Sequence, residues 1–420
     1  MSVTQAVLGG RRRLSQGELD LIVTAHERLM AGKPGGKRAS LRVVDLSGHD
    51  LSRRNLADAD FSGSTFDGAR MAGANLERAN LFGCDLRGVD LRRANLRRAD
   101  LRGVCLRGAN LALADLTQAD FREGRIAIPH PRKGFDLMRH EDRLGELDQA
   151  IFTGATLDGS QFDGSSAFKA DFTDCSMRGA KLSGANLKEA NLSGAILEDA
   201  EVAGTNLEGA NLSGAVLTGV DTAAAKLSGA NLAGCLRTQA PNPAMEADLR
   251  EQVLANEAWC QTGGKSGKPS VIENQDLRAL GDLLKERRLT ALSVKGCCLV
   301  GMDLSGAALQ GANFENADLR GANLRGADLR GARFTGANLT KADLRETVLA
   351  PLPLGPDRWS PANFVKARLR YVLLALADLQ SAVFDEADLR GADLAGAKTG
   401  RASWRGADLG GVSGFDPSQA

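Results

Sequence analysis

The stretch that decides the fold runs from Glu315 to Leu344 and reads ENADLRGANLRGADLRGARFTGANLTKADL. A large apolar residue returns at every fifth position, and Ala stands two places before each one. An α-helix would spread these residues over all its faces, because each residue turns about 100°. A strand would send successive ones to opposite faces, because its side-chain period is two. The large residues are Leu319, Leu324, Leu329, Phe334, Leu339 and Leu344.

A short extended segment that ends in a corner does fit this period. In Ala-Asp-Leu the first and third side chains point to one face, so Ala and Leu face inward and Asp faces outward. The fourth residue, often Arg or Ser, also faces outward, and the fifth is often Gly, which tolerates positive φ at a tight corner. Such sides wind into coils, and coils stack about 4.8 Å apart through backbone hydrogen bonds. The pattern predicts an all-β solenoid of the parallel β-helix type.

The A-[DN]-L-x-x pattern resembles the pentapeptide-repeat family. The resemblance implies a right-handed, four-sided parallel β-helix with about twenty residues in each coil. The aromatic residues fit that register. Phe364, Phe384 and Trp404 are twenty residues apart and are expected to stack in one internal column, and Phe314 and Phe334 are expected to form another pair.

The pattern divides the chain into two modules. We expect an N-terminal tail and capping helix over residues 1–38, then a first β-helix over 39–240. A second capping helix and linker over 241–288 precede a second β-helix over 289–411, and a C-terminal tail follows over 412–420. Each module is thus a pentapeptide-repeat β-helix opened by an α-helical cap.

Two stretches interrupt the repeat inside the modules. Residues 127–149 form an excursion, with a short helix expected near Leu137–Leu147, after which the repeat resumes one residue out of phase. Residues 350–361 are irregular as well. Fifteen residues separate Leu349 from Phe364, which equals three sides, so we expect a loop that bulges from a continuing coil.

The two predicted helices carry boundary signals. Ser15 and Glu18 form a capping-box pattern ahead of the first helix, and Asn242-Pro243 suits the start of the second. AHERLMAGKPGGKRASL from Ala25 is similar to ANEAWCQTGGKSGKPSVI from Ala255. This similarity favours an internal duplication, and the alternative is chance similarity of two helix ends. A helix with an apolar face can seal the open backbone groups at the end of a β-helix.

The sequence holds no arrangement of catalytic or ligating residues. The histidines lack metal-ligand spacing, and GGKSGKPS at Gly263 follows a predicted helix instead of a strand, so it is not a phosphate-binding loop. Three cysteines take Ala positions of the repeat, where a small buried thiol is expected. We predict no enzymatic activity, no cofactor and no metal site. The histidines are His26, His49, His130 and His140, and these cysteines are Cys84, Cys175 and Cys297.

Overall charge argues against several classes of partner. The formal net charge is +1, which argues against direct nucleic-acid binding. No apolar run reaches the roughly 18 residues that a membrane-spanning helix needs, so we predict no membrane insertion. The basic residues of the N-terminal stretch follow its apolar residues, the wrong order for a secretory signal. We therefore predict a cytoplasmic protein.

Outward charges are unevenly distributed. Between Ala150 and Leu236 there are ten acidic and only five basic residues. Each of the two sets of charged residues named below forms either a solvated, ion-paired surface or a contact for a partner. The candidate surface residues are the basic girdle Arg87, Arg92, Arg93, Arg97, Arg98, Arg102 and Arg107, and the acidic cluster Glu198, Asp199 and Glu201.

These features favour a non-enzymatic protein that presents a rigid surface to a protein partner, whose identity the sequence does not give. The family resemblance implies an alternative, since some members resemble B-form DNA and bind type II topoisomerases such as gyrase. The acidic array suits that alternative, whereas the near-neutral total charge and the interruptions do not. The C-terminal end GVSGFDPSQA contains no helix pattern, which makes a second copy of the chain a candidate cover for that end.

Overall fold

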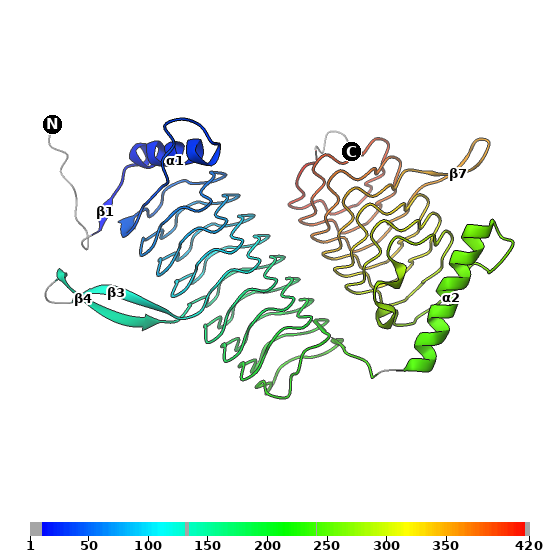
Figure 1. Cartoon of the computed structure of the whole chain (residues 1–420), viewed down its shortest axis with the longest axis horizontal. Coiled ribbons are helices and arrows are strands. Elements are labelled where there is room, and N and C mark those ends of the chain that lie inside the picture. The colour runs from blue at the N-terminus through cyan, green and yellow to red at the C-terminus, as the bar shows by residue number, and fades with distance from the viewer. Residues whose placement is uncertain (1–10, 131–133, 241, 416–420) are drawn as a thin grey trace. The chain divides into compact units, whose positions relative to one another are not determined.

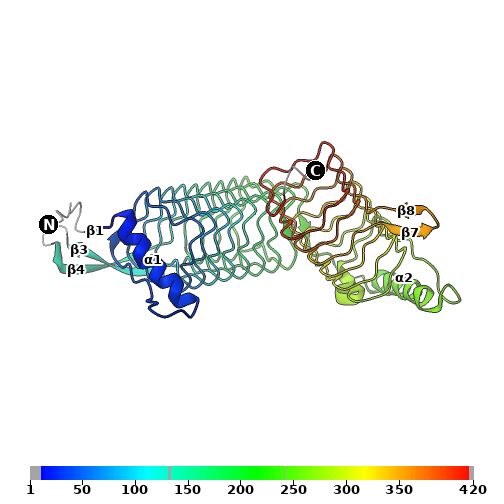
Figure 2. The ribbon, with the colours of Figure 1, turned by 90° about the horizontal axis from the view of Figure 1, so that it is seen from above.

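The structure is a computed structural model that describes residues 11–130, 134–240 and 242–415. The chain divides into two compact units, Met1–Thr238 and Gln239–Ala420. Each unit has a hydrophobic core of its own and is described by itself. Both are stacks of coils, as Figures 1 and 2 show.

Parallel backbone pairs define the coil. Asp50 pairs with Arg70 and Asn323 pairs with Asp343, and the same spacing of twenty residues recurs through both stacks. The Leu51 N–H donates to the Arg70 carbonyl at 2.7 Å, and the Arg70 N–H donates to the His49 carbonyl at 2.9 Å. Because the inward residue recurs every five positions, each coil has four sides. The expected four-sided parallel β-helix is confirmed.

Each corner is a tight turn. The Ala327 N–H donates to the Leu324 carbonyl at 3.0 Å, and Gly326 between them has a φ of 67°. Leu324 and Ala327 are 0% exposed, which confirms the inward assignment. Cys84 takes such an Ala position and its thiol donates to the Phe61 carbonyl at 3.1 Å, so this cysteine is a small buried group as expected.

The first unit begins with a strand and a helix that lie against the first coil. β1 (Arg12–Arg13) pairs in parallel with β2 (Val44–Asp45). α1 (Gln16–Met30) buries Leu19 and Val23 in the core of the unit. The predicted capping box is present, since Ser15 and Glu18 exchange hydrogen bonds at the start of α1. At the other end of the unit, β5 (Val216–Leu217) pairs in parallel with β6 (Leu236–Arg237).

The first excursion is a β-hairpin and not a helix. β3 (Gly124–His130) pairs antiparallel with β4 (Gly134–Arg143), so the prediction of a helix near Leu137–Leu147 was wrong. Two extended segments that pair with each other satisfy each other's backbone groups, whereas a helix would leave the preceding segment unpaired. The next coil pairs Cys105 with Glu146, 41 positions later, which explains the shift of one residue in the repeat.

The second unit opens with α2 (Pro243–Thr262), which buries Leu249 and Val253. Asn242 caps its start, and Gly263 ends it with a φ of 60°. Coil pairing begins at Val271, which pairs with Ser293, and the first coil contains the 3-10 helix η1 (Arg278–Leu284). The second β-helix therefore begins before Leu289, where the sequence pattern placed its start. The pattern missed this coil because 22 residues separate Val271 from Ser293.

The second interruption is also a hairpin. β7 (Leu352–Gly355) pairs antiparallel with β8 (Arg358–Ser360). Arg333 pairs with Asn363, thirty positions later, so the hairpin adds ten residues to one coil. The added length also places five aromatic rings in one column, where the sequence predicted two separate columns. Neighbouring ring centroids are 4.5 to 4.9 Å apart along the column Phe314, Phe334, Phe364, Phe384 and Trp404.

Candidate interaction surfaces

The arginines of the predicted basic girdle lie around the whole coil. Their sides follow from the coil register, which places them on all four sides. The arginines thus surround the coil as the sequence predicted, and they do not form a stripe along the stack. In chain order the sides carry Arg87 and Arg107, then Arg92 and Arg93, then Arg97 and Arg98, and finally Arg102.

Several of these arginines form two-point ion pairs with the aspartate two residues earlier. Arg92 Nε and Nη2 donate to the Asp90 carboxylate at 2.8 and 2.7 Å. This pairing holds the pKa of Asp90 below its usual range, since the charged carboxylate accepts both bonds. Arg87 with Asp85 and Arg102 with Asp100 repeat the same geometry.

Other girdle arginines contact the following coil. Arg97 lies 3.1 Å from the Asp115 carboxylate and Arg107 lies 3.0 Å from that of Glu146. Arg98 Nε donates to the Gln118 side chain at 2.8 Å. The positive charge of the girdle is therefore largely neutralised, which favours its interpretation as a solvated, ion-paired surface. Its role as a contact for a partner stays a prediction.

The acidic cluster is divided between two sides. Glu198 lies 3.0 Å from Arg178, twenty residues earlier, and Glu201 starts the next side beside Lys181. Asp199 occupies the corner between them with a φ of 55°. Two further glutamates of the acidic array form ion pairs with lysines one coil away. These pairs are Lys169 with Glu189 at 3.3 Å and Lys188 with Glu208 at 3.6 Å.

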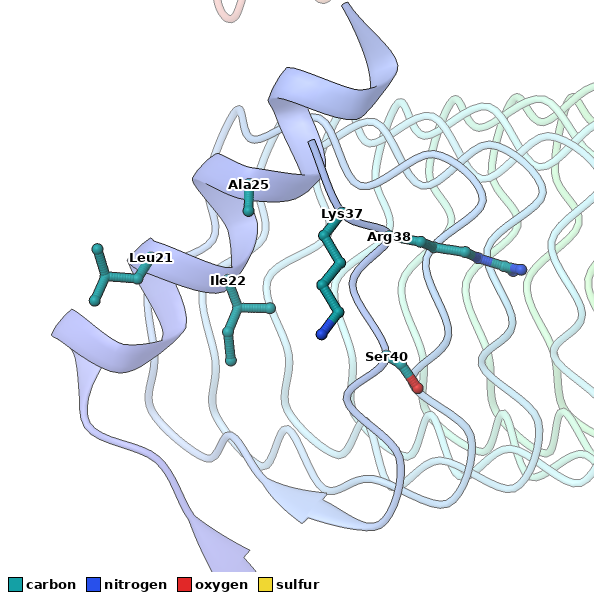
Figure 3. A pocket seen from close by; sticks show the side chains of 6 residues that line it. All are labelled: Leu21, Ile22, Ala25, Lys37, Arg38 and Ser40. Atoms are coloured by element: carbon teal, nitrogen blue, oxygen red, sulfur yellow. The ribbon is translucent and has the colours of Figure 1, made fainter. Parts of the chain in front are cut away.

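α1 and the first coil enclose a hollow that sequence reasoning missed. It has a volume of about 380 Å³, and Figure 3 shows the side chains around it. Leu21 is 75% exposed and leaves one side of α1 uncovered. The lining contains no carboxylate, His or Cys, so it offers no acid–base pair for catalysis. Its residues are Leu21, Ile22, Ala25, Lys37, Arg38 and Ser40.

The β7–β8 hairpin lies in the stretch where the sequence predicted a bulging loop, residues 350–361. Its base rests on a corner column, because Leu352 packs against Gly331 and Gly311. Its outer part exposes Leu354 and Trp359, whose exposed fractions are 54% and 63%. A large exposed aromatic residue on a rigidly anchored hairpin is typical of a protein contact. The signal in the sequence is Trp359 within a stretch where the repeat fails.

The described residues form neither a metal site nor a membrane-spanning helix. In residues 11–130, 134–240 and 242–415, no group of His, Cys, Asp or Glu side chains is arranged to hold a metal ion. No helix in this part of the chain is long and apolar enough to cross a bilayer.

Solved structures that are similar to this chain include three pentapeptide repeat proteins. A pentapeptide repeat protein of the Arabidopsis thaliana thylakoid lumen is 33% identical over 20% of this chain and 66% of its own, with a TM-score of 0.18. HetL of Nostoc, a pentapeptide repeat protein involved in heterocyst differentiation regulation, is 20% identical over 93% of this chain and 96% of its own, with a TM-score of 0.18. QnrB1, a plasmid-mediated fluoroquinolone resistance protein, is 20% identical over 51% of this chain and 92% of its own, with a TM-score of 0.23.

Among curated proteins, no sequence matches this chain. The family model for pentapeptide repeats does match, and its copies cover more than half of the residues. The matched ranges are 37–73, 74–112, 94–125, 170–209, 195–236, 293–326, 313–349, 362–398 and 387–413. These ranges cover much of the coils, include no residue of α1, α2 or the β7–β8 hairpin, and reach only the first two residues of β3. The chain belongs to the pentapeptide repeat family.

Proposed function

We propose that this protein is a non-enzymatic interaction protein that presents a rigid β-helical surface to a protein partner. The observation that carries the proposal is the filled interior. Inward side chains such as Leu91 and Leu324 are 0% exposed, so the described coils hold no internal chamber for a substrate. What the coils offer is a long surface of fixed geometry.

The β7–β8 hairpin is the partner contact that we favour. Hot spots of protein interfaces are enriched in Trp, and they centre on anchors that enter a pocket of the partner. Trp359 is exposed, while the base of the hairpin is fixed by Leu352 on the corner glycines. The outer residues are therefore held in place before binding, which lowers the entropy lost on association.

The hairpin can be removed without breaking the repeat. Deleting residues 350–359 takes out ten residues and returns Leu349 and Phe364 to a spacing of one side. Pro361 would then occupy a corner that needs positive φ, so the deletion is combined with Pro361→Gly. The inward residues on either side of the deletion are unchanged.

Affinity purification from the native host would compare the wild type with this deletion and with Trp359→Ala. We expect one or more proteins to be retained by the wild type and lost with both variants. Arg405→Ser, on an exposed side far from the hairpin in sequence, is the matched control and should retain them. Equal recovery of all bound proteins by the wild type and both hairpin variants would contradict the proposed contact.

A second candidate function is topoisomerase binding by DNA mimicry. The acidic excess between Ala150 and Leu236 favours it. The pairing of Glu198 with Arg178 and of two other glutamates with lysines reduces that excess. A gyrase supercoiling assay decides the matter, since no effect at micromolar protein would exclude this function.

We propose that the protein forms a homodimer in which a second copy of the chain packs against the C-terminal end of the coil stack. Leu409, Val412 and Phe415 of the last described coil pack against the core but are only partly buried. Light scattering after size exclusion should then report a dimer, and Leu409→Lys should convert it to a monomer. A wild-type monomer at micromolar concentration would contradict this assembly.

A further inference from the structure

α1 and α2 are held on their first coils by the same set of contacts. In each unit, a backbone N–H from the segment after the helix donates to a helix carbonyl, and a glutamate two residues further along the helix forms an ion pair with a coil arginine. This correspondence supports the internal duplication. The matching contacts are Lys37 N with Ala25 O at 3.0 Å and Lys268 N with Ala255 O at 3.2 Å, then Glu27 with Arg54 and Glu257 with Arg287.

The helices differ at the residue between these contacts. His26 of α1 is 0% exposed, and its Nδ1 accepts the Ala39 N–H at 3.2 Å. Since Nδ1 accepts, Nε2 carries the proton and donates to the Ala57 carbonyl at 2.9 Å. Asn256 of α2 is also 0% exposed, and its Nδ2 donates to the Thr290 carbonyl at 3.3 Å, whereas its Oδ1 accepts no hydrogen bond from the described residues.

We propose that His26 is an acid-sensitive latch that holds α1 on the first coil at neutral pH and releases it at mildly acidic pH. Asn256 takes the same place in α2 and cannot titrate. Protonation of His26 puts an N–H on Nδ1, opposite the N–H of Ala39. Two buried donors then face each other and Ala39 loses its acceptor, whereas an amide in this place keeps one donor and one acceptor at every pH.

The charged groups around His26 come from each element packed against it. Burial is the largest influence and lowers the pKa of His26 below its ordinary 6.5. Arg38, in the segment after α1, lowers the pKa further, while the Ala57 carbonyl, Asp58 of the coil and Glu27 of α1 raise it. Because the folded state favours neutral His26, its contribution to stability is complete above pH 6.5 and is lost as the pH falls through the lowered value. Glu27 and Asp58 themselves have lowered pKa values, so both stay ionised between pH 5.0 and 7.5.

This latch is independent of the proposed partner. Its release would uncover the apolar face of α1, with Leu19 and Val23, and the backbone edge of the first coil at Ser40. An open edge of this kind pairs readily with another strand. The N-terminal end would thus become a binding surface only in acid.

Hydrogen exchange of the full chain, followed by mass spectrometry, tests the latch. Exchange is measured at pH 7.5 and 5.0 and corrected for the intrinsic rate at each pH. The opening equilibrium of α1 should rise more than about twofold at pH 5.0, with a ceiling of about thirtyfold set by the unfolded pKa near 6.5. The opening of α2 should change less than about twofold, since it lacks the titrating group.

Two substitutions, each made in a separate variant, make the test specific. His26→Asn should abolish the acid response of α1, and Asn256→His should give α2 an acid response of its own. His49, which lies beside the Leu14 and Ser47 carbonyls, is present in every variant and is therefore common to all of them. An equal response of both helices in the wild type, or a wild-type response in His26→Asn, would overturn the latch. If His26→Asn loosens α1 at both pH values, its pH response decides, and a remaining acid-induced rise between pH 7.5 and 5.0 rejects the proposal.

Discussion

In this fold a buried residue and an exposed residue can be direct neighbours in the sequence. Leu324 is 0% exposed, whereas Arg325 lies on the surface and pairs with Glu346. Leu324→Asp places a charge in a dry core and should destabilise its unit by more than about 4 kcal/mol. Arg325→Ser removes an exposed pair and should change stability by less than about 1 kcal/mol. Urea unfolding monitored by circular dichroism measures both, and equal tolerance would refute the assignment of the two positions.

Glycine is favoured at corners for two separable reasons. Gly326 and Gly331 both have positive φ, at 67° and 68°. A Cβ on Gly326 would meet nothing within 4 Å, whereas one on Gly331 would lie 2.7 Å from the Leu352 Cβ. Gly326→Ala should therefore cost about 1 kcal/mol from backbone strain alone. Gly331→Ala should cost at least about 1 kcal/mol more, because the base of the hairpin must move. Thermal melts that show equal losses would mean that the hairpin does not rest on this corner.

Along each side of the coil, the outward Asp or Asn closes a small local ring. Asp50 accepts the Ser52 N–H at 2.9 Å, and Asn75 accepts the Glu77 N–H at 3.2 Å in the same way. The bonds from Ser52, followed by that from Arg70, lower the pKa of Asp50 to about 2. The amide performs the same backbone task without titrating, which is why the two residue types alternate freely at this position.

Acid stability should depend on how many of these positions are Asp. The folded state lowers the pKa of Asp50, so its contribution is complete above the unfolded value of 3.8 and is lost as the pH falls toward 2. Asp50→Asn should therefore flatten the loss of stability between pH 4 and 2 while it leaves the stability near pH 7 little changed or slightly lower. Urea midpoints measured across that range check this. An unchanged slope would mean that Asp50 has an ordinary pKa in the folded protein.

The elements that interrupt the repeat were the least predictable part of the sequence. The distance between Leu349 and Phe364 is a multiple of five, so the period gives no sign that ten of those residues leave the coil. The structure reveals it through the pairing of Arg333 with Asn363, thirty positions later, and through the stacking of Phe334 on Phe364 with centroids 4.7 Å apart. The His26 latch was equally hidden. Its two backbone partners, Ala39 and Ala57, have no side-chain signal in the sequence.

At the scale of the whole molecule, the period predicted which residues form the cores, because inward and outward positions are fixed within five residues. It did not predict the surface contacts, because those depend on which residues lie one coil apart. The girdle shows the difference. Arg92 could be paired from sequence with Asp90 two places away, whereas the pairing of Arg107 with Glu146 depends on the length of the hairpin between them.

The two units should fold independently, since their buried residues form separate clusters and most coil contacts join residues about twenty positions apart. A solenoid gains stability from neighbouring repeats, so a break in one unit is not transmitted to the other. Leu324→Asp should therefore expose the second unit to proteolysis and leave residues 11–238 protected. Leu91→Asp, its counterpart in the first unit, should do the reverse. Limited proteolysis with mass spectrometry reads out each unit separately, and loss of both units with either single variant would show that the two cores unfold as one.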